Sequence, residues 1–168
     1  MDLRVGGVVA YPPHGVGRII AREKRVVLGV EEEVVIVELG NELSVTLPLS
    51  RAQEQLRAPA SEADLKKVQK ALRENGVVSD EIWSKRVQYA QEKLRSGDPL
   101  ELAEIVRDGV RREQGKTANG TPTKLSTSER ALHLKARELL TGEISVTRGL
   151  DQAEADAWID DQLAAAKA

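Results

Sequence analysis

The chain has 168 residues, and its 25 Lys and Arg nearly balance its 27 Asp and Glu. This length accommodates one or two small domains with enough apolar residues for a core. The absence of cysteine excludes disulfides, thiolate metal sites and cysteine nucleophiles, and two histidines are too few for a histidine-based metal cluster. The sequence has neither a membrane-spanning apolar run nor the pattern of a signal peptide, so we expect a cytoplasmic protein that does not contact a membrane.

Charge is distributed unevenly along the chain. Residues 85–148 hold 13 Lys and Arg against 9 Asp and Glu, whereas residues 149–168 hold one Lys against five acids. A mildly basic block followed by an acidic segment is typical of a protein that touches a polyanion with one face only. An ordinary solvated surface of mixed charge is the alternative.

Residues 1–58 have the composition of β-strands. Their apolar runs are short and rich in Val and Ile, and Gly, Asn and Pro separate these runs. We expect strands at residues 5–11, 16–21, 26–29, 34–39 and 43–47. Five short strands in so short a segment predict a small SH3-like or Tudor-like β-barrel.

A stiff corner separates the first two expected strands. Residues 8–17 read Val-Val-Ala-Tyr-Pro-Pro-His-Gly-Val-Gly, and the second apolar run begins at Val16. Proline fixes φ and glycine permits positive φ, so this segment turns the chain sharply between two strands. Many small β-barrels have such a corner, and the rest of the chain is needed to interpret it.

After Pro59 the spacing of the apolar residues becomes helical. Capping signals predict five helices, which begin at Ser61, at Ser79 or Asp80, at Asp98, at Ser126 and at Asp151. The segment from Gly115 to Lys124 is rich in Gly, Asn, Thr and Pro and predicts a flexible loop. The fold class is therefore α+β. A small SH3/Tudor-like β-barrel is expected over residues 1–58 and a compact all-α domain of about five helices over residues 59–168.

No constellation of residues supports enzymatic chemistry. The glycines at 6–7 and 15–17 lack the Gly-Lys-Ser/Thr ending of a phosphate loop. The three glutamates at 31–33 cannot all converge on one cation from a turn between strands, so a solvated turn is the better interpretation. His14 and His133 have no local Ser or Asp partner. We therefore predict no catalytic residue, no metal site and no cofactor, and a protein that is not an enzyme.

Trp83 has two interpretations. Its spacing from Val87 and Leu94 places it on an apolar helical stripe, where it would anchor a core. It also falls in the first turn of the expected helix, beside Lys85 and Arg86. A tryptophan flanked by cations is suited to wedge against an unstacked base while the cations hold phosphates.

Five segments, taken in order, resemble the CarD/CdnL family of bacterial transcription factors. They are the Tyr-Pro-Pro-His-Gly-Val-Gly corner at 11–17, Trp-Ser-Lys-Arg at 83–86, Glu-Lys-Leu-Arg-Ser-Gly-Asp at 92–98, Ala-Glu-Ile-Val-Arg-Asp at 103–108 and Lys-Ala-Arg-Glu-Leu-Leu-Thr-Gly-Glu-Ile at 135–144. Each segment alone is of medium specificity, but the ordered set covers essentially the whole chain. The corner also resembles the polymerase-interacting domain of the transcription-repair coupling factor.

The resemblance implies a global transcription regulator that binds DNA. In this family the helical domain contacts promoter DNA at the upstream edge of the transcription bubble, without sequence specificity, and this contact stabilises the open promoter complex. Trp83 matches the family's minor-groove wedge, and Lys85 and Arg86 match the basic pair that follows it. Arg130 matches a basic residue early in a later helix. The resemblance therefore assigns these four residues to DNA binding.

The resemblance assigns RNA polymerase binding to the N-terminal barrel, which in this family docks on the polymerase β subunit. Arg25, on the strand after the corner, matches a polymerase-contacting arginine, and Val27 is assigned to the same contact. Two departures from the family pattern weaken the match, since Thr46 and residues 87–88 stand where the family often has cations. The expected protein is a monomer that is associated with the nucleoid through RNA polymerase.

A different class of function is also compatible with the sequence. The chain could be a protein–protein adaptor on RNA polymerase that makes no direct DNA contact. Such an adaptor would tolerate the loss of Lys85 and Arg86, whereas a DNA-binding protein would not.

Overall fold

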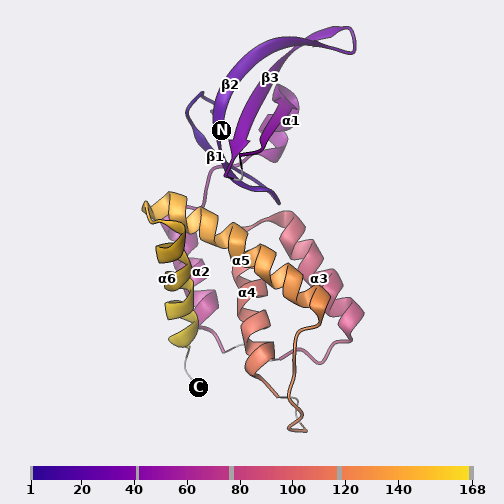
Figure 1. Ribbon diagram of the computed structural model, residues 1–168, viewed down its shortest axis with the longest axis vertical. Helices are drawn as coiled ribbons and strands as arrows, with labels where there is room; N and C mark the ends of the chain where they lie inside the picture. The colour runs from indigo at the N-terminus through magenta and orange to yellow at the C-terminus, as the bar shows by residue number, and fades with distance from the viewer. Residues whose placement is uncertain (1, 41, 76–77, 117–118, 167–168) are drawn as a thin grey trace. The chain divides into compact units, whose positions relative to one another are not determined.

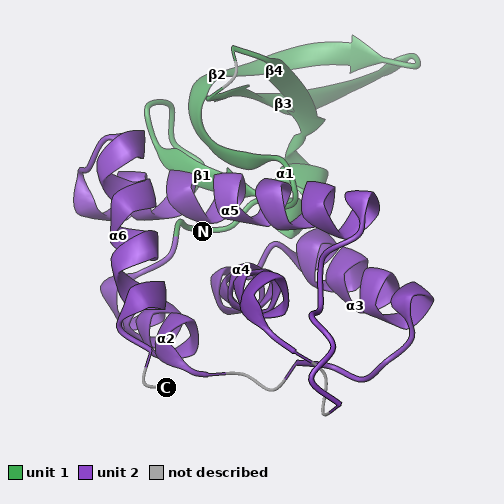
Figure 2. Cartoon of the chain, turned by 60° about the horizontal axis from the view of Figure 1, so that its bottom comes forward, with its two compact units in different colours: residues 1–59 green, residues 60–168 purple. Residues whose placement is uncertain are grey.

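The computed structural model describes residues 2–40, 42–75, 78–116 and 119–166. The chain divides into two units, residues 1–59 and residues 60–168, which we call the β unit and the helical unit (Figure 2). Each has its own buried apolar cluster. The α+β class, with a β module followed by helices, is confirmed.

The β unit is a curled antiparallel sheet of four strands in the order β1-β2-β3-β4 (Figure 1). Its strands are β1 (Val8–Tyr11), β2 (Gly15–Val27), β3 (Val30–Leu39) and β4 (Ser44–Pro48). The short helix α1 (Leu49–Gln55) follows β4 and contributes Ala52 to the core of this unit. Alternate residues of the strands face that core, among them Ile19, Val35 and Val37.

Two predictions for the β unit are wrong. Residues 26–29 are not a separate strand, because β2 continues to Val27 and pairs with β3 along a long hairpin that turns at Leu28 and Gly29. The glutamates at 31–33 lie in β3 and not in a turn, and they pair in register with Val26, Arg25 and Lys24. The cations opposite two of these glutamates offset the cross-strand charge.

Helix α1 is not predicted by the sequence. The sheet is a half-barrel of four strands, and Asn41, which precedes β4 in the sequence, lies outside the described residues.

The corner between β1 and β2 is as sharp as the sequence predicts. Tyr11 pairs with Gly15, and the backbone of Gly15 has a φ of 111°, a value that glycine adopts without strain. A Cβ atom at Gly17 would lie 2.7 Å from the carbonyl oxygen of Glu38, so only glycine lets β2 approach β3 this closely. The glycines of the corner therefore fix the start of the long hairpin.

The helical unit contains five helices among its described residues. They are α2 (Glu62–Arg73), α3 (Trp83–Ser96), α4 (Pro99–Gln114), α5 (Thr127–Arg148) and α6 (Gln152–Ala164). Leu72, Leu102 and Leu140 meet in the core, which draws residues from α2, α4, α5 and α6. In contrast, α3 has no fully buried residue. No helix in the described part of the chain is both long and apolar enough to cross a lipid bilayer.

Four of the five predicted helix starts are confirmed. The side chains of Ser61, Asp98, Ser126 and Asp151 each accept a backbone N–H of the first helical turn. The prediction for α3 is wrong, because that helix begins at Trp83 after Ile82 and has no side-chain cap. The hydroxyl of Ser79 instead accepts the N–H of Glu81 at 3.1 Å, a local bond that competes with helix formation.

Candidate functional site

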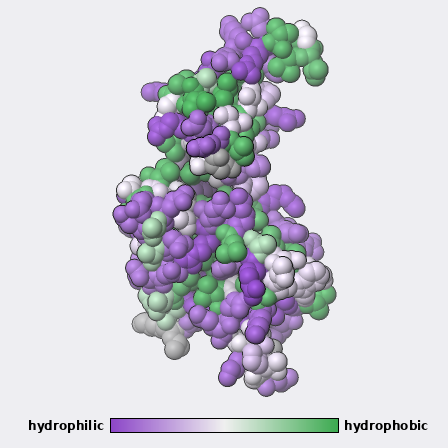
Figure 3. Space-filling view, in the orientation of Figure 1, coloured by the Kyte–Doolittle hydropathy of each residue, from purple (hydrophilic) through white to green (hydrophobic). Residues whose placement is uncertain are grey.

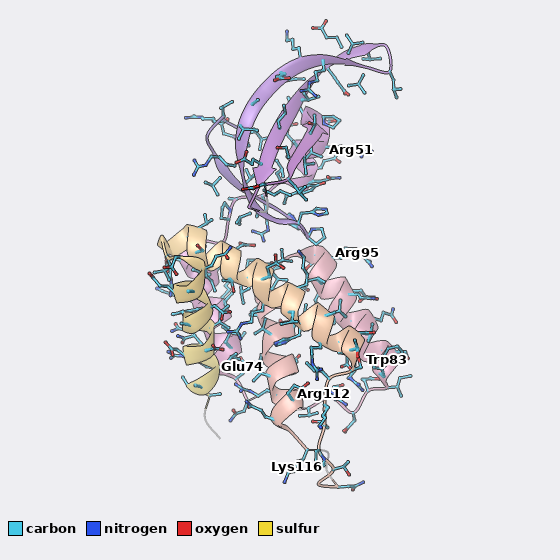
Figure 4. The ribbon with its side chains drawn as sticks, viewed as in Figure 1. Arg51, Glu74, Trp83, Arg95, Arg112 and Lys116 are labelled. Carbon is cyan, nitrogen blue, oxygen red and sulfur yellow. The ribbon has the colours of Figure 1, made fainter. Side chains whose placement is uncertain are left out.

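Trp83 is the first residue of α3, and it lies where the first turns of α3 and α5 meet (Figure 4). Half of its surface is exposed, at 50%. Its indole Nε1–H donates a hydrogen bond of 2.8 Å to the hydroxyl oxygen of Ser126, the N-cap of α5. Trp83 is therefore not a core anchor. Its ring is held at the surface by one polar contact.

One turn further along, Arg86 joins the same two helices. Its Nε and Nη2 donate to the two carboxylate oxygens of Glu129 at 3.1 and 2.9 Å. The Glu129 side chain is only 8% exposed and that of Arg86 17%, so the pair is largely shielded from water. Glu129 also completes a capping box, because it accepts the backbone N–H of Ser126 and gives its own N–H to the Ser126 hydroxyl.

The ionised form of Glu129 is favoured at this place. Burial alone would raise the pKa of the Glu129 carboxyl, but the hydrogen bonds from Arg86 and Ser126 together outweigh burial and lower that pKa below its ordinary value. The carboxylate therefore stays charged at neutral pH. It forms an internal ion pair on which the junction of α3 and α5 depends.

A cavity of about 230 Å³ lies on the inner side of this junction, between α3, α4 and α5. Arg86, Arg112 and Glu129 are among the residues that line it. Arg112 donates to the carbonyl oxygens of Ser79 and Lys124, both at 3.2 Å. Its burial and the nearby Arg86 lower the pKa of the Arg112 guanidinium. Both arginines therefore serve contacts within the protein.

The remaining predicted DNA-binding residues are on the surface. Lys85 is exposed on α3, two residues after Trp83. Arg130 is 57% exposed in the first turn of α5, where its guanidinium donates to Glu113 at 3.0 Å. That hydrogen bond from Arg130 is the main reason that the pKa of Glu113 is lowered. Because Ser126 and Glu129 join the starts of α3 and α5, the structure brings Trp83, Lys85 and Arg130 to one end of the helical unit.

The β unit presents a second candidate surface at the turn of the β2–β3 hairpin. Hydrophobic side chains gather there (Figure 3). We call this surface the hairpin tip; it comprises the exposed residues Val26, Val27, Leu28 and Val30. Leu28 is 99% exposed, and its φ of 52° is in the left-handed region. Exposed apolar patches of this kind mark protein-docking sites.

Arg25 lies next to the hairpin tip on β2. Its guanidinium pairs with Glu23 of the same strand at 2.9 Å, and both side chains are close to half exposed. Exposed ion pairs contribute little to stability, so Arg25 can exchange Glu23 for a carboxylate on a partner at small cost. Arg25 and Val27, the two residues predicted to contact a polymerase, thus fall on one continuous surface.

Two parts of these sites could not be found by sequence reasoning. The sequence identifies Ser126 as a helix cap, but nothing in it indicates that the same hydroxyl accepts from Trp83, 43 residues away. The pairing of Arg86 with Glu129 is equally distant in sequence. Among the described residues, no group of three or more His, Asp or Glu side chains is arranged to hold a metal ion.

Comparison with known proteins relates both units to transcription factors. The model of the CarD-like/TRCF RID domain matches residues 3–59, and that of the CarD C-terminal domain matches residues 67–160. The chain is also 26% identical over 152 residues to YdeB of Bacillus subtilis (strain 168), which is named as a candidate transcription factor. That alignment covers 89% of this chain and 94% of YdeB.

Proposed function

The chain belongs to the CarD family of transcription factors, which interact with RNA polymerase, and we propose that it acts by stabilising the open promoter complex. In this proposal the β unit binds the polymerase β subunit. The helical unit contacts promoter DNA at the upstream edge of the transcription bubble. The protein acts as a monomer and is associated with the nucleoid through the polymerase.

The hairpin tip supports the polymerase part of the proposal. An exposed apolar turn with Arg25 beside it offers burial of Val27 and Leu28 together with one charge-assisted hydrogen bond. The long β2–β3 hairpin also has extended backbone near this surface, which is suited to recognition by another sheet. Both features favour a protein partner for the β unit.

The single observation that carries the DNA part is the exposed ring of Trp83 between two helix N-termini, with Lys85 and Arg130 at the same end. An aromatic ring stacks on any base or base step, and cations hold the phosphates on either side. The partial positive charge of helix N-termini adds to this field. The indole N–H is already bonded to Ser126, so it is not free to read the acceptors of a base edge. Recognition without sequence preference follows.

The proposed mechanism is differential binding. Contacts that form only with the melted bubble edge lower the free energy of the open complex and not that of the closed complex. A wedge with a few phosphate contacts contributes about 2–4 kcal/mol. The chain has a net charge of −2, which disfavours tight binding to free DNA. Docking on the polymerase supplies the local concentration that the helical unit needs.

The test uses the 168-residue chain with Trp83→Ala and measures the half-life of open promoter complexes. We expect the half-life to fall, with the melting temperature nearly unchanged because the ring is half exposed. Leu134→Ala is the matched control, since Leu134 is a large exposed apolar residue on α5. Binding to polymerase should survive both changes.

Two outcomes would contradict the proposal. A Trp83→Ala half-life equal to that of Leu134→Ala, with polymerase binding retained, would leave the chain as an adaptor on the polymerase without DNA contact. A large drop in melting temperature would instead return Trp83 to a structural role.

A further inference from the structure

We propose that Ser126, Glu129 and Arg86 are positioning residues that hold the Trp83 ring in one orientation before DNA is met. We call these three residues the clamp. This inference rests on the proposed function, in which Trp83 contacts DNA. It concerns how the ring is presented, and it assigns to Arg86 a role other than phosphate binding.

The first element of the clamp is the hydroxyl of Ser126. Its oxygen accepts the indole N–H of Trp83 at 2.8 Å and the backbone N–H of Glu129 at 3.2 Å. A hydroxyl oxygen has two acceptor lone pairs, so both bonds form together. The exposed ring is thereby tied to the rigid first turn of α5. A tryptophan at the start of a helix would otherwise sample several rotamers.

The second element is the ion pair between Arg86 and Glu129. Arg86 makes two bonds to this carboxylate, and its Nη1 donates to the carbonyl of Glu81 at 2.8 Å. If Arg86 turned outward to hold a phosphate, it would leave a carboxylate that is 8% exposed without its counter-ion, which is costly. Arg86 therefore fixes α3 against α5, and the phosphate role falls to the exposed Lys85.

A ring that is already ordered loses less conformational entropy when it binds. Immobilising one side chain at an interface reduces affinity by about twofold to tenfold, so a clamp that orders Trp83 in advance avoids a loss of that size. The bond to Ser126 also occupies the one donor of the indole. The ring then meets DNA through its face and its apolar edge only.

The test compares Ser126→Gly with Ser61→Gly in the 168-residue chain. Both serines are N-caps in capping boxes, of α5 and α2, but only Ser126 contacts a tryptophan. Glycine is nearly as good an N-cap as serine, so both variants should fold. Solvent exchange of the two indole N–H groups is followed by NMR, with Trp158 as the internal reference. The half-life of open promoter complexes is measured on the same proteins.

With Ser126→Gly, we expect the Trp83 indole N–H to exchange about fivefold faster or more, the factor that corresponds to one hydrogen bond of ordinary strength. The open-complex half-life should fall by about twofold to tenfold relative to Ser61→Gly. Ser126→Thr keeps the hydroxyl and should restore both values. Unchanged indole exchange in Ser126→Gly would overturn the clamp. Faster indole exchange in Ser126→Gly, together with an open-complex half-life equal to that of Ser61→Gly, would overturn the role of the clamp in positioning Trp83.

Arg86 is tested by the salt dependence of binding to the polymerase–promoter complex. Removing a phosphate contact lowers the slope of log affinity against log salt by about one unit, which we expect for Lys85→Ala. Arg86→Ala should weaken binding and accelerate indole exchange with the slope unchanged. A slope reduced equally by both variants would make Arg86 a phosphate ligand and overturn its assignment. If Trp83→Ala has no effect on open complexes, the proposed function fails, and indole exchange still reports on the clamp.

Discussion

At the scale of single residues, Glu129 joins Arg86, which lies 43 residues away in the sequence, to Ser126, the N-cap of its own helix. Its carboxylate accepts two bonds from Arg86 and one from the Ser126 backbone, whereas its own N–H goes to the Ser126 hydroxyl. It is one of the few charged side chains that are buried among the described residues. A buried carboxylate with this many donors makes the junction of α3 and α5 dependent on its charge.

Glu129→Gln should therefore lower the free energy of unfolding at neutral pH. It should also reduce the loss of stability that acidification causes. The pKa of Glu129 is lowered in the folded protein, so its stabilising effect is complete above the ordinary pKa of glutamate and is lost as the pH falls toward the folded value. Losing the charge-assisted bonds should cost about 1.5–3 kcal/mol at pH 7. Denaturant unfolding of the unaltered protein and of Glu129→Gln, from pH 7 to pH 3, measures these free energies.

The informative quantity is the difference in the free energy of unfolding between the unaltered protein and Glu129→Gln at each pH, because other carboxylates also titrate in this range. That difference should be largest at neutral pH and should shrink on acidification. Glu113→Gln is a useful comparison, since Glu113 has a lowered pKa but lies on the surface with Arg130. A difference for Glu129→Gln that is constant with pH would mean that its charge does not hold the junction.

At the scale of elements, the contact between α4 and α5 requires a glycine. A Cβ atom at Gly109, in the interior of α4, would overlap the imidazole ring of His133 on α5. Replacing a glycine inside a helix by alanine normally stabilises by about 0.5–1 kcal/mol. Here we expect Gly109→Ala to destabilise by about 1–3 kcal/mol, as overpacking does.

A double-mutant cycle separates the two effects of Gly109→Ala. In a His133→Ala background the overlap is gone, so Gly109→Ala should regain the stabilising effect of a better helix former. Chemical denaturation of the four proteins gives the coupling energy. Equal effects of Gly109→Ala in both backgrounds would show that the ring of His133 does not enforce the glycine.

The sequence predicts those elements whose signals are local. The helix starts at Ser61 and Ser126 can be predicted because a cap and its partners lie within four residues of each other. The start of α3 and the length of β2 were predicted wrongly, since both depend on contacts made far along the chain: α3 on the start of α5, and β2 on pairing with β3. The apolar periodicity is compatible with both a core and a surface position for Trp83. The hydrogen bond to Ser126, which distinguishes the two, is a tertiary contact that the sequence does not indicate.

At the scale of the whole molecule, each unit has an apolar cluster of its own among the described residues. The apolar cluster of the β unit runs from Leu3 to Leu56, and that of the helical unit begins at Ala60. The N–H and the carbonyl of Ala60 are bonded to Glu143 and Thr147 of α5, which assigns this boundary residue to the helical unit. Each unit can therefore keep its own core when the chain is cut between them.

This independence leads to the last prediction, which concerns residues 1–59 expressed alone. The fragment should fold and bind the polymerase β subunit, because it retains both its core and the hairpin tip.

Arg25→Glu in the fragment should weaken binding by about 1–3 kcal/mol through the lost charge-assisted contact and the reversed charge. Arg51→Glu makes the same charge change on α1, away from the tip, and should bind like the unaltered fragment. Titration calorimetry with the β subunit measures all three. A folded fragment that does not bind, or equal weakening by both variants, would exclude the hairpin tip as the polymerase site.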